Sequence, residues 1–278
     1  MEGDDTDTLL VRAMNAYYIA EHNGGKALGE YMVYGESKEM REKNFRNQLQ
    51  SVVANTKKTN AKQRCKLFMA EAKAATAKVQ KLIRDADQWD LVHFDKERGL
   101  RLSEITTEAG EYIFRVEGEI AAPAEMVKKM NLQCDPVPRQ QWDKDLVDIR
   151  MVEVLKHGTL WVLDSVARIN VPMVWDRRYV GLQWYAEVNN GDHYLVTQSI
   201  SPELRKTLSL CERNGTVDAS GFSGMIIRPV DTERCYITMV VQIKPGGWIP
   251  DSAVAWAKEE LLDRLTLFET AYQKVLIQ

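Results

Sequence analysis

The sequence contains no long hydrophobic run. None of its 278 residues falls in a stretch that approaches the roughly 18 apolar residues of a transmembrane helix. The acidic start, MEGDDTDTLLVR, also has no apolar segment of the kind that a signal peptide needs. We therefore expect a cytoplasmic protein.

Cysteine and histidine are scarce and scattered. The four cysteines show no CxxC spacing, which predicts reduced thiols, and the four histidines show no HxxxH spacing and no clustered carboxylates. The sequence therefore predicts no disulfide, no metal site and no cofactor.

Positive charge is not in excess. The formal net charge is −3, whereas a nucleic-acid surface needs concentrated lysine and arginine. The hydrophobic fraction of 45% is that of an ordinary globular core. We expect a folded protein that does not bind nucleic acid.

Familiar catalytic motifs are also missing. GFSGM around Ser223 has methionine where the GxSxG elbow of serine hydrolases needs its second glycine. NGGKALG, at 23–29, does not have the order of a phosphate-binding loop. The sequence predicts no catalytic residue from motifs of this kind.

Two helices are predicted in the N-terminal part. Residues 6–22 have apolar residues at helical spacing, and 61–87 combine strong helix formers with an apolar stripe. The polar segment NTKKTN, at 55–60, is typical of a hinge. We expect an N-terminal helical extension at 1–60 and a second domain at 61–278.

Alternating apolar residues predict strands in the rest of the chain. Three short strands at about 89–120 precede helices at 122–131 and 138–144, and six more strands extend from 145 to 244. The last segment, 249–277, is a long helix with a broad apolar stripe that includes Val254 and Leu261. The predicted class is α+β. Because strand twist curls a sheet of about nine strands, we expect the last helix to lie across its concave face, over a core or a cavity.

Four motifs resemble the START family, the steroidogenic acute regulatory protein-related lipid-transfer domains. They are QQWDKDLVDIRMVEVL, VPMVWDRRYVGLQW, SGFSGMIIRPV and KPGGWIP followed by the last helix, and they occur in the family's order over roughly 60–278. The resemblance implies a helix-grip fold with a hydrophobic tunnel for one lipid. It is closer to the phosphatidylcholine-transfer and ceramide-transfer branches than to the sterol branch.

In this family the loop before the sixth strand and the last helix act as a lid. Met173 and Trp175 would then contact acyl chains or a membrane, because an exposed apolar cluster commonly marks an interaction site. The alternative is that Trp175 packs over the end of the sheet. Arg177 and Arg178 would form an arginine rim that meets anionic lipid headgroups.

The resemblance also indicates a headgroup site. Asp164 falls where many members place an internal acid, and Gln183 falls where sterol-type members often have its arginine partner. An Asp164–Gln183 pair would suit an amide or hydroxyl headgroup, although both residues could be ordinary strand residues. Alternation alone points Val180, Leu182 and Trp184 to the core, whereas the resemblance turns the Gln183 face toward the tunnel.

A choline headgroup would need aromatic rings and a cation near its phosphate. The candidate aromatic residues are Trp161, Trp175, Trp184, Tyr179 and Tyr185, and the candidate cations are Arg168, Arg177 and Arg178. Their convergence in space does not follow from the sequence.

The function that we expect is that of a monomeric carrier for a phospholipid, ceramide or sterol. An enzyme of the thioesterase or cyclase type would need an acid–base pair, for which Asp164 with Tyr185 or His193 is the available combination. A lipid-sensing adaptor, with residues 1–60 docking a partner, is the third alternative.

Overall fold

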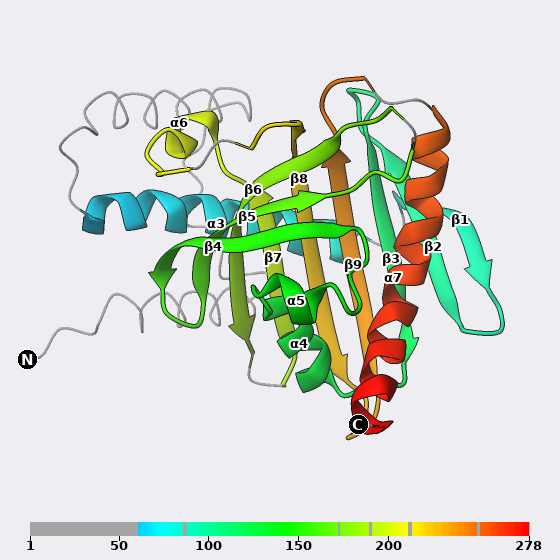
Figure 1. Cartoon of the computed structure of the whole chain (residues 1–278). Coiled ribbons are helices and arrows are strands. Elements are labelled where there is room, and N and C mark those ends of the chain that lie inside the picture. Colours follow the sequence, from blue (N-terminus) through cyan, green and yellow to red (C-terminus); the bar gives the residue numbers. More distant parts are fainter. Residues whose placement is uncertain are drawn as a thin grey trace, which may run out of the picture. The chain divides into compact units, whose positions relative to one another are not determined.

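Nine strands form one sheet in the computed structural model, which describes residues 61–277 except 86–87, 172, 189–190, 211–212 and 249–250. The strands are β1 (Asp90–Asp95), β2 (Leu100–Thr106), β3 (Tyr112–Ile120), β4 (Leu146–Lys156), β5 (Leu160–Ala167), β6 (Asp176–Glu187), β7 (His193–Ser199), β8 (Thr216–Pro229) and β9 (Cys235–Lys244). Their spatial order is β1-β2-β3-β9-β8-β7-β6-β5-β4 (Figure 1). The α+β class and the nine strands, which the period-two pattern predicted, are confirmed, but β6 and β8 begin earlier than the predicted 178 and 222.

The sheet is antiparallel except at one place. The first residues of β8, from Thr216 to Ala219, pair in parallel with the start of β6, and β8 then turns to pair with β7 and β9. Gly221 makes this change of direction possible, because it has a φ of 145° and a Cβ there would lie 2.0 Å from the carbonyl oxygen of Gln242. For this reason β8 begins at Thr216 rather than at 222, where alternation first becomes regular.

The helix α3 (Ala61–Arg84) covers one face of the sheet, which we call the outer face. Its buried residues Phe68, Ala75 and Val79 recur at helical spacing. Gly224 of β8 lies under this helix, because a Cβ at that position would lie 2.1 Å from Val79 Cγ1. Through strand pairing, Val196 and Trp184 belong to the same face.

The opposite face, the inner face, is covered by α4 (Ala124–Leu132) and α7 (Asp251–Ile277). Leu195, Met225 and Met239 from the sheet form one core cluster with Leu265 and Phe268 of α7. Figure 1 shows α7 lying across the sheet, as a helix-grip fold requires.

The two short helices are α5 (Pro136–Arg139) and α6 (Pro202–Arg205). The side chain of Asp135 caps α5 by accepting from the Val137 backbone N–H, so this helix begins before the predicted 138–144 segment. The sequence did not predict α6, which has the same cap-then-proline pattern at Ser201 and Pro202.

The predicted helix at 6–22 and the predicted domain boundary at 60 lie outside the described residues. Within the described part of the chain, no helix is both long and apolar enough to span a membrane.

Candidate functional site

The inner face of β5 and β6 carries the polar residue Gln183. In the strand register Gln183 lies opposite Trp161, and both side chains are buried. The indole Nε1 of Trp161 donates to Gln183 Oε1 at 2.8 Å. Since an indole N–H can only donate, it must face the amide oxygen, and this sets the amide's orientation.

The amide nitrogen of Gln183, Nε2, is therefore the polar atom that Trp161 does not bind. Among the residues that the structure describes, Gln183 is bonded through Oε1, and its Nε2 donates no hydrogen bond to another protein group. The surrounding inner face is apolar, with Trp161 and Leu163 in one buried cluster and Tyr185 packed against it. The site thus presents a donor of an uncharged amide within apolar surroundings.

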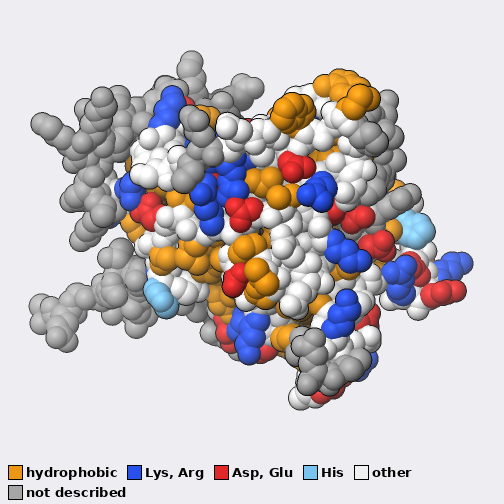
Figure 2. Space-filling model, in the orientation of Figure 1, with side chains coloured by type: hydrophobic (Ala, Val, Ile, Leu, Met, Phe, Trp, Pro, Cys, Tyr) orange, Lys and Arg blue, Asp and Glu red, His pale blue; other side chains and the backbone are white. Residues whose placement is uncertain are grey.

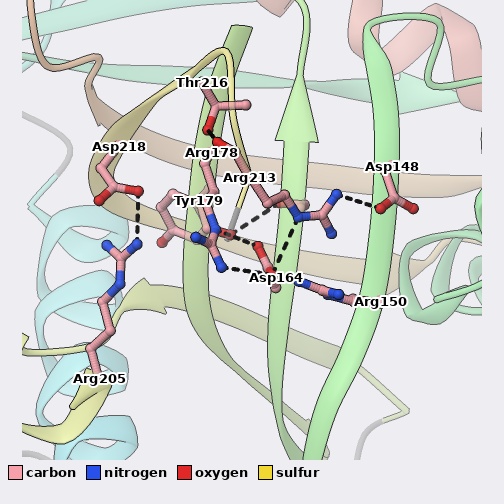
Figure 3. Close-up of polar contacts among 10 residues, drawn as sticks. Asp148, Arg150, Asp164, Arg178, Tyr179, Arg205, Arg213, Thr216 and Asp218 are labelled. Atoms are coloured by element: carbon pink, nitrogen blue, oxygen red, sulfur yellow. Dashed lines mark hydrogen bonds and ion pairs between the residues drawn. The ribbon is translucent and has the colours of Figure 1, made fainter. Parts of the chain in front are cut away.

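Asp164 does not pair with Gln183, and that prediction is wrong. Asp164 lies opposite Val180 in the register, on the outer face, whereas Gln183 is on the inner face. The carboxylate of Asp164 is fully buried and accepts from the guanidinium groups of Arg178, Arg150 and Arg213 (Figure 3). Burial raises the pKa of Asp164, but its hydrogen bonds with Arg178 and Arg150 outweigh this effect and hold the pKa below its ordinary value.

Arg178 and Arg177 are not an exposed rim, so that interpretation is also corrected. β6 begins at Asp176, which places both arginines inside the strand, and both are buried. Arg178 donates to Asp164 Oδ1 at 2.9 Å, and Arg177 Nε donates to the Pro245 carbonyl oxygen at 2.7 Å. Both guanidinium groups are thus occupied by partners within the protein.

The loop residues Met173 and Trp175 are exposed, at 94% and 61% of their surfaces. Met173 is also the one non-glycine residue with positive φ, 62°, in the described part of the chain. Trp175 does not pack over the sheet as a buried residue. Its contact with lipid stays a prediction.

Sequence reasoning missed a second exposed tryptophan, Trp248, which follows β9 and is 73% exposed. Arg177 connects the two tryptophan-bearing loops, because its guanidinium group donates to the carbonyl oxygens of Trp175, Pro245, Gly246 and Trp248. Figure 2 shows hydrophobic side chains gathered at the top of the view, where the loop after β9 lies in Figure 1. The motif PGGWIP contained the signal, an apolar aromatic residue directly after two turn glycines.

The residues proposed for a choline cage do not converge. Trp161, Tyr179 and Tyr185 are on the inner face, but Trp184 is buried on the outer face and Trp175 is in the loop. Tyr179 OH donates to the Gly221 carbonyl oxygen at 3.0 Å, and burial raises the pKa of the phenol. Of the candidate cations, Arg168 is exposed after β5.

The acid–base pair of the enzyme alternative is not assembled either. Asp164 and Tyr185 are on opposite faces of the sheet, and His193 lies on the inner face beside Tyr185, with 3.2 Å between Nδ1 and the phenol oxygen. Burial lowers the pKa of His193, with Lys128 adding to the effect, so its imidazole is neutral at pH 7.

Of the α7 residues proposed to line the site, Leu261 is buried in the core cluster. The side chain of Val254 lies outside the described residues. A hollow of about 370 Å³ is present beside Arg150 and Arg213. It is not the expected tunnel, since Arg150 pairs with Asp164 on the outer face. The tunnel itself stays a prediction.

Comparison with known proteins gives a family and a set of related folds. The START domain model matches residues 70–261. Human StAR-related lipid transfer protein 5 shares 15% sequence identity over 76% of this chain and 98% of its own, with a TM-score of 0.63. Human STARD10 shares 19% identity over 67% of this chain and 74% of its own, with a TM-score of 0.56.

A third related structure, a fragment of the STAR-related lipid transfer protein from Xanthomonas axonopodis, shares 21% identity over 69% of this chain and 99% of its own, with a TM-score of 0.52. At these identities the structural similarity shows the fold. No curated protein sequence matches the chain.

Proposed function

Since this chain belongs to the START domain family, we propose that it is a non-enzymatic lipid carrier that holds one lipid between the inner face of the sheet and α7. The family match over 70–261 is the observation that carries the proposal. Three of the similar structures have lipid transfer in their names. The carrier acts as a monomer in the cytoplasm and exchanges its lipid with membranes that it touches transiently.

Gln183 is the proposed contact for the lipid headgroup. Its Oε1 is held by Trp161, so its Nε2 donates to an oxygen of the ligand. Such an acceptor occurs in the phosphate or ester groups of a phospholipid, in the amide of ceramide and in the hydroxyl of a sterol. A ligand that covers this N–H without offering an acceptor would leave the donor unsatisfied, which is costly, and this selects ligands that place an oxygen there.

Membrane contact is proposed for Met173, Trp175 and Trp248, which we call the two-tryptophan surface. Aromatic side chains with a polar N–H suit the interface between water and the acyl chains. Arg177 supports this surface by binding the backbone of both loops. Lipid would enter and leave at this end of β6.

Native mass spectrometry of the full chain, purified from a eukaryotic lysate, tests the proposal. We expect one lipid molecule per chain, and extraction identifies its class. Purified chain that carries no lipid, but turns over an acyl thioester, would refute the carrier function in favour of an enzyme.

A matched pair of variants tests the headgroup contact. Gln183→Leu removes the amide donor from the inner face, whereas Gln198→Leu removes the same group from the outer face, where Gln198 pairs with Leu182. We expect the first variant to lose bound lipid and the second to keep it. Equal lipid content in both variants would contradict the role of Gln183 while leaving the carrier function open to the first test.

A further inference from the structure

Three residues that can bind a metal ion meet at the α4 end of the inner face. They are Glu125 in the first turn of α4, Glu187 at the end of β6 and His193 at the start of β7. One ligand atom from each lies within 4.8 Å of the others. This end of β6 is opposite to the two-tryptophan surface, so the group is separate from the proposed lipid entrance.

The imidazole of His193 is buried and contacts a second residue, as the imidazole of a histidine metal ligand commonly does. Its side chain is 4% exposed, and its Nδ1 lies 3.2 Å from the hydroxyl of Tyr185. When the ring proton is on Nδ1, the histidine donates to that hydroxyl, and the hydroxyl donates to Glu187 Oε2 at 3.3 Å. In this tautomer the lone pair of Nε2 is available to a metal ion. A second residue that fixes the tautomer in this way is typical of histidine ligands.

His193 Nε2 faces a carboxylate. Nε2 lies 3.3 Å from Glu125 Oε1. Either a proton on Nε2 or a cation that replaces this proton can lie between the two atoms. Zinc binds histidine nitrogen at about 2.0–2.1 Å and carboxylate oxygen at about 2.0–2.2 Å, so two tetrahedral ligands are separated by roughly 3.4 Å. The observed spacing therefore accommodates the ion with almost no movement.

Charge at the site also favours a cation. Lys128 binds the other oxygen of Glu125, with 2.5 Å between Nζ and Oε2, and this contact holds the carboxylate with Oε1 toward the histidine. The ammonium group offsets one of the two carboxylates, and Glu187 leaves the site negative. Because Glu187 is exposed at the end of its strand, its side chain can close the remaining distance.

We propose that Glu125, Glu187 and His193 bind a Zn²⁺ ion, with water in the fourth position. Three protein ligands with one open position are a normal set for zinc. The ion would connect α4 to the strands β6 and β7 and so close this end of the inner face. The sequence did not predict this site because Glu125 and Glu187 are 62 positions apart (187 − 125), and a turn separates Glu187 from His193.

Titration of the metal-free full chain with zinc chloride near neutral pH, followed by calorimetry, tests the proposal. We expect one ion per chain and a rise in Tm when zinc is added, because an ion that binds only the folded state stabilises it. Glu187→Gln removes one exposed ligand and should weaken binding by about tenfold or more, and His193→Gln should abolish it.

Two matched variants control for binding elsewhere. Glu119→Gln removes a half-exposed carboxylate that pairs with Arg234, and His157→Gln removes an exposed imidazole. Both should bind zinc as the unchanged chain does. The absence of zinc binding to the unchanged chain would overturn the proposal, and so would one-to-one binding that survives in Glu187→Gln and His193→Gln. Because Glu187 is exposed, its variant gives a result even if His193→Gln does not fold.

Discussion

Asp164 contacts three arginines from three different segments, β4, β6 and the loop before β8. A buried carboxylate of this kind is tolerated because each of its oxygens accepts hydrogen bonds from a cation. Through these contacts Asp164 holds the outer face together. Gln183, three residues beyond the partner of Asp164 on β6, has the opposite orientation, and within the described residues its Nε2 donates to no protein group.

Replacing Asp164 by asparagine should destabilise the protein strongly. The substitution removes the carboxylate to which the buried Arg178 donates, and removing one member of a buried ion pair costs about 3–5 kcal/mol. The free energy of unfolding in urea measures the loss. Asp218→Asn is the matched control, since Asp218 pairs with Arg205 at the surface and such pairs contribute about 0–1 kcal/mol. Equal losses in the two variants would contradict the buried role of Asp164.

The contribution of Asp164 should also depend on pH. Its pKa is lower in the folded chain than the unfolded value of about 3.9, so the unfolded chain binds more protons between the two values. The stabilisation is therefore complete above the unfolded pKa and is lost as pH falls through the folded pKa. The difference in unfolding free energy between the unchanged chain and Asp164→Asn should shrink as the solution is acidified below pH of about 4. A constant difference across this range would show that the charge is not its source.

At the scale of elements, α3 approaches β8 at Gly224 more closely than any side chain allows. A Cβ there would lie within 2.1 to 2.9 Å of three atoms of Val79. The glycine thus sets the distance between the helix and the outer face of the sheet. On the inner face, the position of α7 is set by Leu265 and Phe268, whose side chains are fully buried.

Gly224→Ala should destabilise the protein by about 1–3 kcal/mol, because the added methyl group forces α3 away from the sheet. Val79→Ala removes Cγ1 and Cγ2, the two atoms that the new methyl group would approach most closely. In a double-mutant cycle measured by urea unfolding, the two substitutions together should cost less than the sum of each alone. Additive losses would mean that the two residues do not share this contact.

At the scale of the whole molecule, the ends of β6 serve different purposes. At its start, Arg177 joins the loop that carries Trp175 to the loop that carries Trp248. The other end of β6, at Glu187, lies near Glu125 of α4. The proposed carrier therefore opens at the two-tryptophan surface.

Substituting Trp175 or Trp248 with serine should slow vesicle-to-vesicle lipid transfer and weaken vesicle binding by roughly tenfold or more, since burying a large apolar side chain contributes about 1.5–3 kcal/mol. The unfolding free energy should stay nearly unchanged, because both side chains are exposed. Val137→Ser, at an apolar residue that is exposed on α5, is the control and should transfer lipid normally. Unfolding in the tryptophan variants would show instead that these residues belong to the core.

Arg177→Lys tests whether the two tryptophans act together. An ammonium group cannot span the carbonyl oxygens of both loops, so the loops should lose their fixed relation. In this background each tryptophan substitution should have a smaller effect on vesicle binding than in the unchanged chain. Equal effects in both backgrounds would show that the loops bind the membrane independently.

The sequence alone determined the strands and the long helices of this protein and their order, but not the short helix α6. Periods of two and of 3.6 residues reflect which side of a strand or helix is apolar, so they predicted the nine strands, α3 and the long α7 from local residues. The resemblance of four motifs to the START family gave the helix-grip arrangement, and with it the correct assignment of the Gln183 side of β6 to the inner face.

Only the tertiary structure decided which side chains meet. A strand pattern does not contain the register with its neighbour, and the register placed Asp164 opposite Val180 and Gln183 opposite Trp161. Because β6 begins at Asp176, Arg177 and Arg178 lie inside the strand and are buried, whereas the sequence analysis placed them at the surface. Glu125 and His193 meet because α4 packs on the end of the sheet. Such contacts join residues far apart in the chain, and no local pattern of residues records them.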